Sequence, residues 1–271
     1  MDKMSTVASL LFAAGRGTRM KGYFGNKTLL PLIPAKSPYQ GARPLIREVL
    51  DNLPAGPRGI VVNYHAEQVR RVTEGGGISF VDQPVTNGTG GALLAARSFL
   101  NSADADRVII TMGDVPLIRA ATYYRLLDLL GRFELTLLAF ECKDRGQYGM
   151  IEMEGERVTG IVEWKYWKDF PLERQSSLRY CNAGVYAAGK NTLLRYLDRL
   201  EKRPHDVRKQ QNGEWFTLRE YFLTDLAEMM NEDGLSVGMA PVPEEEVAGV
   251  DTPESLEAVQ KLYARLQVVS E

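Results

Sequence analysis

The chain has 271 residues, of which 44% are hydrophobic and 25% are charged, a composition typical of globular proteins that excludes long disordered or collagen-like regions. The 33 Lys and Arg residues nearly balance the 35 Asp and Glu residues, and the resulting net charge of -2 argues against a nucleic-acid-binding protein. The two histidines, His65 and His205, are far apart and lack ligand spacing, which argues against a zinc site built on His side chains.

The apolar runs and the first residues bear on where the protein resides. No apolar run approaches the ~20 residues that cross a bilayer. Residues 1–6 lead directly into a strand-like stretch, without the basic, apolar and cleavage segments of a leader peptide. We therefore expect a cytoplasmic protein with no membrane or nucleic-acid partner. The oligomeric state stays open.

The first half of the chain alternates short apolar strands with helical segments. Strand patterns cover 7–13, 60–62, 78–81, 108–112 and 135–140, and helical patterns cover 67–73, 91–100 and 118–130. This alternation predicts an α/β fold with a mostly parallel mixed sheet and helices on both faces.

The second half has a different character. The pattern predicts a hairpin from 150–153 and 158–163, a strand over 180–187, helices over 191–200 and 218–230, and a polar loop over 203–215. Thr252, Pro253 and Glu254 supply a cap, a first-turn proline and early acidic charge for a final helix. Without repeats or linkers, we expect a single domain over residues 1–271.

The most informative segment is the glycine-rich stretch 13–20, Ala-Ala-Gly-Arg-Gly-Thr-Arg-Met, which follows the first strand and precedes Lys27. Glycines at a strand end let backbone N–H groups approach a phosphate, and Arg16, Arg19 and Lys27 add positive charge. The spacing differs from the dinucleotide fingerprint, because Met20 stands at the third glycine position, and no Gly-Lys-Ser/Thr forms a Walker loop. A tight turn with solvated basic residues is the alternative. The clustered cations favour an anion site.

This segment resembles the signature of sugar-1-phosphate nucleotidyltransferases, and the chain is most similar to the uridylyltransferase domain of the bifunctional N-acetylglucosamine-1-phosphate enzymes. Further matches fall in the family order at Gln83 with 88–90, 113–117, 148–149, 162–165, 182–184, 221–225 and 246–251. Each match is weak by itself, but the series covers nearly the whole chain. The resemblance implies a Rossmann-like nucleotidyltransferase fold with a nucleotide-binding half (1–117), a sugar-binding half (118–251) and a C-terminal helix (252–271).

The resemblance also implies the reaction, in which UTP and N-acetylglucosamine 1-phosphate or glucose 1-phosphate give a UDP-sugar and pyrophosphate. The nucleophile is already a phosphate anion, so no general base is needed, and cations and a divalent metal must stabilise the charge. By resemblance, Arg19 and Lys27 are catalytic, and Asp114 and Asp251 bind Mg²⁺ through hard oxygen ligands. Asp251 directly precedes the last helix, so capping that helix is its alternative role.

The remaining site residues implied by the resemblance form two groups. The nucleotide-binding group is Phe12, Ala13, Ala14, Gly15, Arg16, Gly17, Gln83, Gly88 and Thr89. The sugar-binding group is Gly113, Gly149, Glu163, Asn182 and Thr224. The amide of Gln83 can flip to suit uracil or cytosine, so a cytidylyl- or thymidylyltransferase remains an alternative, as does a catalytically inactive nucleotide-sugar binder.

Several features depart from the family pattern. Segment 33–43 is longer than its family counterpart, one extra residue lies between Met20 and Lys27, and Met112 replaces a common aromatic residue. The chain ends at Glu271, with no counterpart of the acetyltransferase domain of the bifunctional enzymes. We therefore expect no acetyltransferase activity from it.

Overall fold

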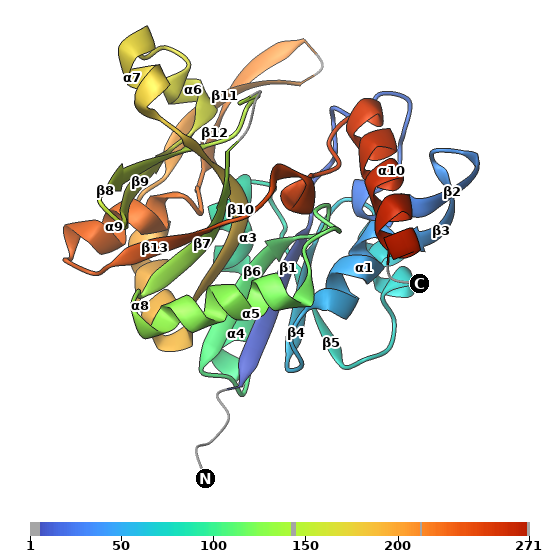
Figure 1. Ribbon diagram of the computed structural model, residues 1–271, viewed down its shortest axis with the longest axis horizontal. Helices are drawn as coiled ribbons and strands as arrows, with labels where there is room; N and C mark the ends of the chain where they lie inside the picture. Colours follow the sequence, from blue (N-terminus) through green and yellow to red (C-terminus); the bar gives the residue numbers. More distant parts are fainter. Residues whose placement is uncertain (1–5, 142–144, 212, 270–271) are drawn as a thin grey trace.

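The computed structural model describes residues 6–141, 145–211 and 213–269, and its centre is a nine-stranded mixed sheet (Figure 1). Seven strands follow the order β13-β7-β10-β6-β1-β4-β5: β1 (Val7–Ala13), β4 (Arg58–Val62), β5 (Ile78–Asp82), β6 (Arg107–Met112), β7 (Leu135–Phe140), β10 (Tyr180–Gly189) and β13 (Val237–Pro241). β1 is parallel to β4 and β6, β4 to β5, and β13 to β7, whereas β10 is antiparallel to β6 and β7. The predicted mostly parallel mixed sheet is confirmed.

Helices cover both faces of the sheet, because successive side chains of a strand point to opposite sides. In β1, Leu10 and Phe12 belong to one apolar core, whereas Leu11 and Ala13 belong to the other. The first core is covered by α3 (Gly88–Ala95), α4 (Arg97–Ser102), α8 (Lys190–Glu201) and α9 (Asp225–Glu232), and the second by α1 (Leu45–Asn52), α2 (Ala66–Val72) and α5 (Ala120–Asp128). Among the described residues, no helix is long and apolar enough to cross a membrane.

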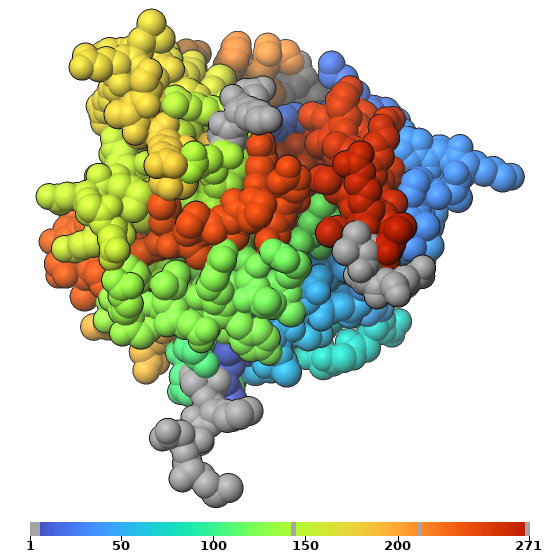
Figure 2. Space-filling view, in the orientation of Figure 1, coloured from blue at the N-terminus to red at the C-terminus, as the bar shows by residue number. Residues whose placement is uncertain are grey.

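The long segment 33–43 belongs to a hairpin that packs against the last helix. The hairpin consists of β2 (Pro31–Ser37) and β3 (Gln40–Pro44), and it protrudes beside α10 (Pro253–Val269) in Figure 2. The buried amide of Gln260 in α10 donates hydrogen bonds to the carbonyl oxygens of Pro31 and Pro38, at 2.7 and 2.8 Å. The hairpin is thereby fixed to the C-terminal helix.

The predicted hairpin in the second half is also present, and it extends the central sheet. β8 (Met150–Glu154) and β9 (Arg157–Val162) are antiparallel, and β8 pairs with β10. Two short helices follow, α6 (Trp164–Trp167) and α7 (Leu172–Ser177), and 3-10 turns occupy Lys27–Leu29, Leu129–Gly131 and Glu244–Val247.

Two predictions for the region between α8 and α9 are wrong. The expected loop over 203–215 is instead part of an antiparallel hairpin of β11 (His205–Gln211) and β12 (Glu214–Glu220), and the helix expected from 218 begins only at Asp225. The hairpin forms its own two-stranded sheet with largely exposed faces. Its strands therefore satisfy their backbone groups by pairing without the apolar alternation that identifies a strand packed on a core.

Candidate active site

A cavity of about 640 Å³ opens at the carboxyl ends of β1 and β6, which is the edge where ligands bind in open α/β sheets. Every predicted nucleotide-binding residue lines it: Phe12, Ala13, Ala14, Gly15, Arg16, Gly17, Gln83, Gly88 and Thr89. Lys27 and Asp114 also line it, together with residues of β11 and β12 for which the sequence pattern indicated no role. The fold thus brings together groups from well separated parts of the chain.

A glycine and a buried asparagine shape the loop between β1 and Lys27. Gly17 has φ +59°, a left-handed conformation that other residues rarely adopt, and a side chain there would meet Lys27 at 3.5 Å. The buried amide of Asn26 donates to the Ala13 carbonyl at 2.8 Å and accepts from the Thr28 N–H at 3.0 Å. Sequence reasoning missed Asn26, although an Asn directly before a short helical turn is a capping pattern.

Lys27 lies at the centre of the charged groups. Its ammonium nitrogen contacts the Asp114 carboxylate and the Asp251 carboxylate, the latter at 2.5 Å, and 15% of the side chain is exposed. Burial lowers the pKa of Lys27, but the two carboxylates outweigh it, so the net pKa is raised. Burial alone would raise the pKa of Asp251, but the positive charges of Lys27 and Arg19 outweigh burial, and the net pKa of Asp251 is lowered. Lys27 is therefore held charged between two carboxylates.

The start of α10 bears on the predicted capping role of Asp251. The Thr252 hydroxyl oxygen accepts from the Ser255 N–H at 3.2 Å, and the Ser255 hydroxyl accepts from the N–H of Asp251 at 2.8 Å. Thr252 and Ser255 therefore cap α10, and the Asp251 carboxylate contacts Lys27 instead. A hydrogen bond of 2.9 Å from the Val250 N–H to the Asp114 carbonyl joins the two acidic segments.

Arg19 lies beside this cluster and does not line the cavity. Its guanidinium contacts Asp251 at 3.0 Å and donates to the Gln147 side chain at 3.5 Å, and 55% of the side chain is exposed. Of the two predicted catalytic cations, Lys27 thus lines the cavity, whereas Arg19 contacts the other carboxylate oxygen of Asp251.

The segment predicted to read the base surrounds a buried glutamine. The Gln83 amide nitrogen donates to the Asn87 side chain at 3.1 Å and to the Gly88 carbonyl at 3.3 Å. Both amide hydrogens are therefore engaged within the loop, and the side-chain oxygen is the group left to accept from a ligand. Gly88 has φ +91°, and a side chain there would meet the Tyr221 carbonyl at 2.4 Å. Only glycine fits at this position.

Four of the predicted sugar-binding residues form a second group. The Thr224 hydroxyl donates to the Glu163 carboxylate at 2.7 Å, and a side chain at Gly149 would lie 3.9 Å from that carboxylate. The Asn182 N–H donates to the Gly149 carbonyl at 2.8 Å, and its side-chain amide donates to Tyr186 at 2.7 Å. Burial raises the pKa of Glu163, which the Thr224 hydrogen bond opposes.

Gly113, the fifth predicted sugar-binding residue, has a packing role at the end of β6. Its N–H donates to the Phe12 carbonyl at 2.9 Å, and a side chain there would meet the Thr28 methyl group at 2.9 Å. Glycine is required at this position by the close approach of the loop that carries Lys27.

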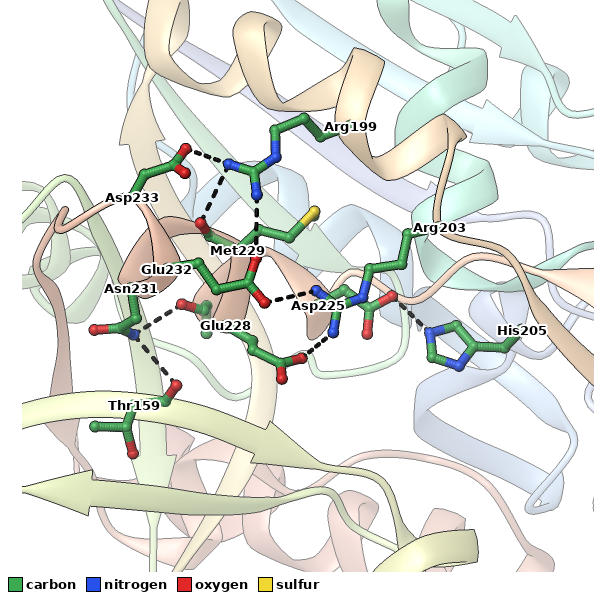
Figure 3. A network of polar contacts seen from close by, with 11 residues as sticks. Thr159, Arg199, Arg203, His205, Asp225, Glu228, Met229, Asn231, Glu232 and Asp233 are labelled. Atoms are coloured by element: carbon green, nitrogen blue, oxygen red, sulfur yellow. Dashed lines mark hydrogen bonds and ion pairs between the residues drawn. The ribbon is translucent and has the colours of Figure 1, made fainter.

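A smaller cavity of about 200 Å³ adjoins Glu163 and Thr224 and is bordered by groups that the sequence did not suggest. His205, at the start of β11, contacts the Asp225 carboxylate at 2.8 Å and the Tyr166 hydroxyl at 3.1 Å. Figure 3 shows this contact beside the ion pairs that join Arg199 and Arg203 of the α8 end to acidic residues of α9. These contacts fix the start of the β11–β12 hairpin against α9.

Asp114 and Asp251 fit the requirements of a shared Mg²⁺ ion. Both contact the same Lys27 nitrogen, so their carboxylates lie within about 6 Å, or two charge-assisted hydrogen-bond lengths. In the described part of the chain, no group of three or more His, Cys, Asp or Glu side chains could hold a metal ion. Two carboxylates without a complete protein cage suit Mg²⁺, which usually takes its other ligands from water and substrate phosphates.

Comparison with known proteins relates this arrangement to a family. The sequence model of a protein family, described as the MobA-like NTP transferase domain, matches residues 9–207 of this chain. The bifunctional protein GlmU of Ruegeria sp. (strain TM1040) is 32% identical, over 98% of this chain and 55% of that protein. The chain spans about half the length of the curated relatives it matches.

Solved structures show the same fold at low sequence identity. A protein described as a UDP-N-acetylglucosamine pyrophosphorylase, from Entamoeba histolytica, has a TM-score of 0.72 at 14% identity, covering 98% of this chain and 82% of that chain. The uridine diphosphate N-acetylglucosamine pyrophosphorylase of Trypanosoma brucei has a TM-score of 0.69 at 14% identity, covering 94% and 65%. The resemblance proposed from the sequence motifs and the Rossmann-like nucleotidyltransferase fold are both confirmed.

Proposed function

Because the chain belongs to the family of MobA-like NTP transferase domains, we propose that it joins UTP to a sugar 1-phosphate, either N-acetylglucosamine 1-phosphate or glucose 1-phosphate, and releases pyrophosphate. One observation carries the proposal. Lys27, Asp114 and Asp251 meet at a cavity lined by all nine predicted nucleotide-binding residues. A protein that only bound nucleotide sugars would have no need of a buried cation beside two carboxylates at the phosphate end of its site.

In the proposed reaction, an oxygen of the sugar 1-phosphate attacks the α-phosphorus of UTP. A new phosphorus–oxygen bond forms, the bond between the α-phosphorus and the bridging oxygen to the β-phosphate breaks, and pyrophosphate leaves with that electron pair. Backbone N–H groups of residues 12–17 and the Arg16 side chain would hold the triphosphate. Lys27 would stabilise the charge that develops on the transferred and leaving groups.

Mg²⁺ is part of the proposal, with Asp114 and Asp251 as its protein ligands. When bound, it would neutralise phosphate charge and help to align the two substrates. Lys27 already contacts both of these carboxylates, and it would add its own positive charge to that supplied by the ion.

The oxygen left free on Gln83 supports a base that presents a hydrogen-bond donor. Uracil offers its N3–H to such an acceptor, and cytosine offers its amino group, so this contact alone does not separate the two. The two solved neighbours named above favour uracil, because both are described as UDP-N-acetylglucosamine pyrophosphorylases. UTP is therefore the proposed donor, and CTP is the alternative.

For the sugar, the proposal rests on the group around Glu163. Its carboxylate accepts from Thr224 through one oxygen, which leaves the other oxygen, Oε2, toward Gly149 to accept from a sugar hydroxyl. Gly149 leaves space beside it for a ring substituent. The Asn182 amide is held by Tyr186 and by the Gly184 N–H, and it would make its remaining hydrogen bonds to the sugar.

The test is a matrix of nucleoside triphosphates against sugar 1-phosphates, followed by pyrophosphate release. We expect UTP with N-acetylglucosamine 1-phosphate or glucose 1-phosphate to be turned over fastest. A preference for ATP or GTP would contradict the base-site assignment. Binding of UDP-sugar without turnover of any pair would instead support a nucleotide-sugar binder.

A further inference from the structure

The β11–β12 hairpin presents one face to the nucleotide cavity. Lys209 pairs with Phe216, and Val207 pairs with Leu218, so these side chains lie on the same face. Lys209, Phe216, Leu218 and Glu220 from this face line the cavity, and Gln210 reaches it from the other side of the strand. We call Lys209, Phe216, Leu218 and Glu220 the hairpin face. Trp215, next to Phe216, lies on the opposite face and is 61% exposed.

The end of β12 is joined to the segment that is predicted to bind the nucleobase. The Tyr221 N–H donates to the Asn87 carbonyl at 2.9 Å, and the Gly90 N–H donates to the Tyr221 carbonyl at 2.8 Å. The Thr89 hydroxyl oxygen accepts from the Leu223 N–H at 3.1 Å. The hairpin face is therefore positioned relative to the same loop that holds Gln83.

The charges on the hairpin face are paired. Glu220 has only 8% of its surface exposed, and its carboxylate contacts the Lys209 ammonium group. A bare carboxylate lining a cavity for a triphosphate would repel it and weaken its binding. Lys209 removes that repulsion. Phe216, 40% exposed, adds an aromatic surface to the same wall.

We propose that the hairpin face is a wall of the nucleotide site, in which Phe216 packs against the nucleoside and Lys209 is a positioning residue that neutralises Glu220. This inference rests on the proposed function, because it requires a nucleoside triphosphate in the cavity. It adds two residues, from a segment whose sequence pattern suggested only a loop, to the binding of the nucleotide.

The test compares two ligands by calorimetry: UTP, and inorganic tripolyphosphate, which lacks the nucleoside. Phe216→Ala should weaken UTP binding by roughly 5- to 100-fold, the range found when an aromatic side chain that packs on a base is removed. Tripolyphosphate affinity should not change. Trp215→Ala is the matched control, because it removes a larger aromatic side chain from the other face, and it should leave both affinities unchanged.

The outcomes separate this inference from the proposed function. If Phe216→Ala bound UTP as tightly as the wild type, the inference that Phe216 packs against the nucleoside would be wrong, and the proposed function would still stand. An equal loss of affinity for both ligands would also overturn it, since the nucleoside contact would then not be the cause. If the wild-type protein bound neither UTP nor any other nucleoside triphosphate, the proposed function itself would fail. Phe216→Leu, which keeps an apolar side chain, should show a smaller loss for UTP than Phe216→Ala.

Lys209 is tested by rescue. Lys209→Met leaves Glu220 unpaired and should weaken both UTP and tripolyphosphate by about tenfold or more. The double variant Lys209→Met with Glu220→Gln should regain most of the affinity for both ligands, because no charge then remains to repel them. A double variant as weak as the single variant would contradict the neutralising role and indicate direct contact between Lys209 and a phosphate.

Discussion

The two cavities differ in the groups that neighbour their buried carboxylates. At the larger cavity, the Lys27 ammonium group gathers carboxylates from the end of β6 and the start of α10, and the pKa of Asp251 is lowered. At the smaller cavity, burial raises the pKa values of Glu163 and Asp225, and their neighbours include a hydroxyl and an imidazole.

This difference suits two kinds of ligand. Fixed positive charge beside carboxylates suits phosphates and a divalent ion, because both charged partners must be neutralised in the same place. Carboxylates that lack a strong cationic partner suit neutral hydroxyl groups, because a carboxylate can accept a hydrogen bond from a hydroxyl group without a large change in charge. Under the proposed function, the phosphates would occupy the first cavity and the sugar ring would lie near the second. The following predictions test this division.

The largest effect is expected for Lys27. Lys27→Met should lower kcat by roughly 10²–10³, the effect of deleting one preorganised group that stabilises developing charge. Arg19→Met should have a smaller effect, because the Arg19 side chain is half exposed and does not line the cavity. Steady-state pyrophosphate release measures both. Lys21→Met, at an exposed position of the same loop, is the control. An equal loss in the Arg19 and Lys27 variants would contradict the geometry.

The next effect concerns the acidic pair. Asp251→Ala should raise the Mg²⁺ concentration needed for half-maximal turnover, whereas Asp251→Asn should be mild because an amide oxygen can still bind the ion. Titration of activity with Mg²⁺ measures the shift.

Thr252→Ala separates the proposed metal role of Asp251 from helix capping. It should cost about 1 kcal/mol of unfolding free energy through loss of the cap and leave the Mg²⁺ requirement unchanged. A loss of stability in Asp251→Ala with unchanged Mg²⁺ dependence would contradict the metal assignment.

The sequence predicted the sheet well, and it singled out the loop after β1, because each depends on a local pattern. Buried parallel strands such as β1 and β6 are continuous apolar runs, and the glycine-rich loop after β1 combines glycines with cations. The motif series also placed Asp114 and Asp251 together, although nothing local to either residue indicates the other. The family resemblance, rather than periodicity, carried that information.

The hairpin face and the His205 contacts could not be predicted in the same way. Val207, Phe216 and Leu218 share one face of the hairpin, but Lys209 and Glu220 lie on the same face, so β11 and β12 show no regular apolar alternation in the sequence. His205 meets Asp225 only because the hairpin returns the chain to the start of α9. Asn26 was missed because its importance comes from backbone groups that only the folded loop brings within reach. Interactions of this kind depend on tertiary position and not on residue type.

The smallest effect is expected for the buried carboxylate of Glu163. Because burial raises its pKa above the usual 4.5, the folded state holds its proton more tightly than the unfolded state. The contribution of this group to stability is therefore fully present below about pH 4 and is lost as the pH rises through the raised pKa. Glu163→Gln removes the buried charge and retains an acceptor for Thr224. Its melting temperature should exceed that of the wild type by a few °C at pH 7–8, roughly the shift of a ~1 kcal/mol change in a domain of this size, and the difference should vanish near pH 4.

The same Glu163→Gln variant should raise the KM for the sugar 1-phosphate more than the KM for UTP, since the carboxylate that it replaces lies at the second cavity. Asp82→Asn is the control, because that carboxylate is largely exposed on β5. A Glu163→Gln protein that is less stable than the wild type at neutral pH would show that the carboxylate is paired with a cation after all, and the contrast between the two cavities would not hold.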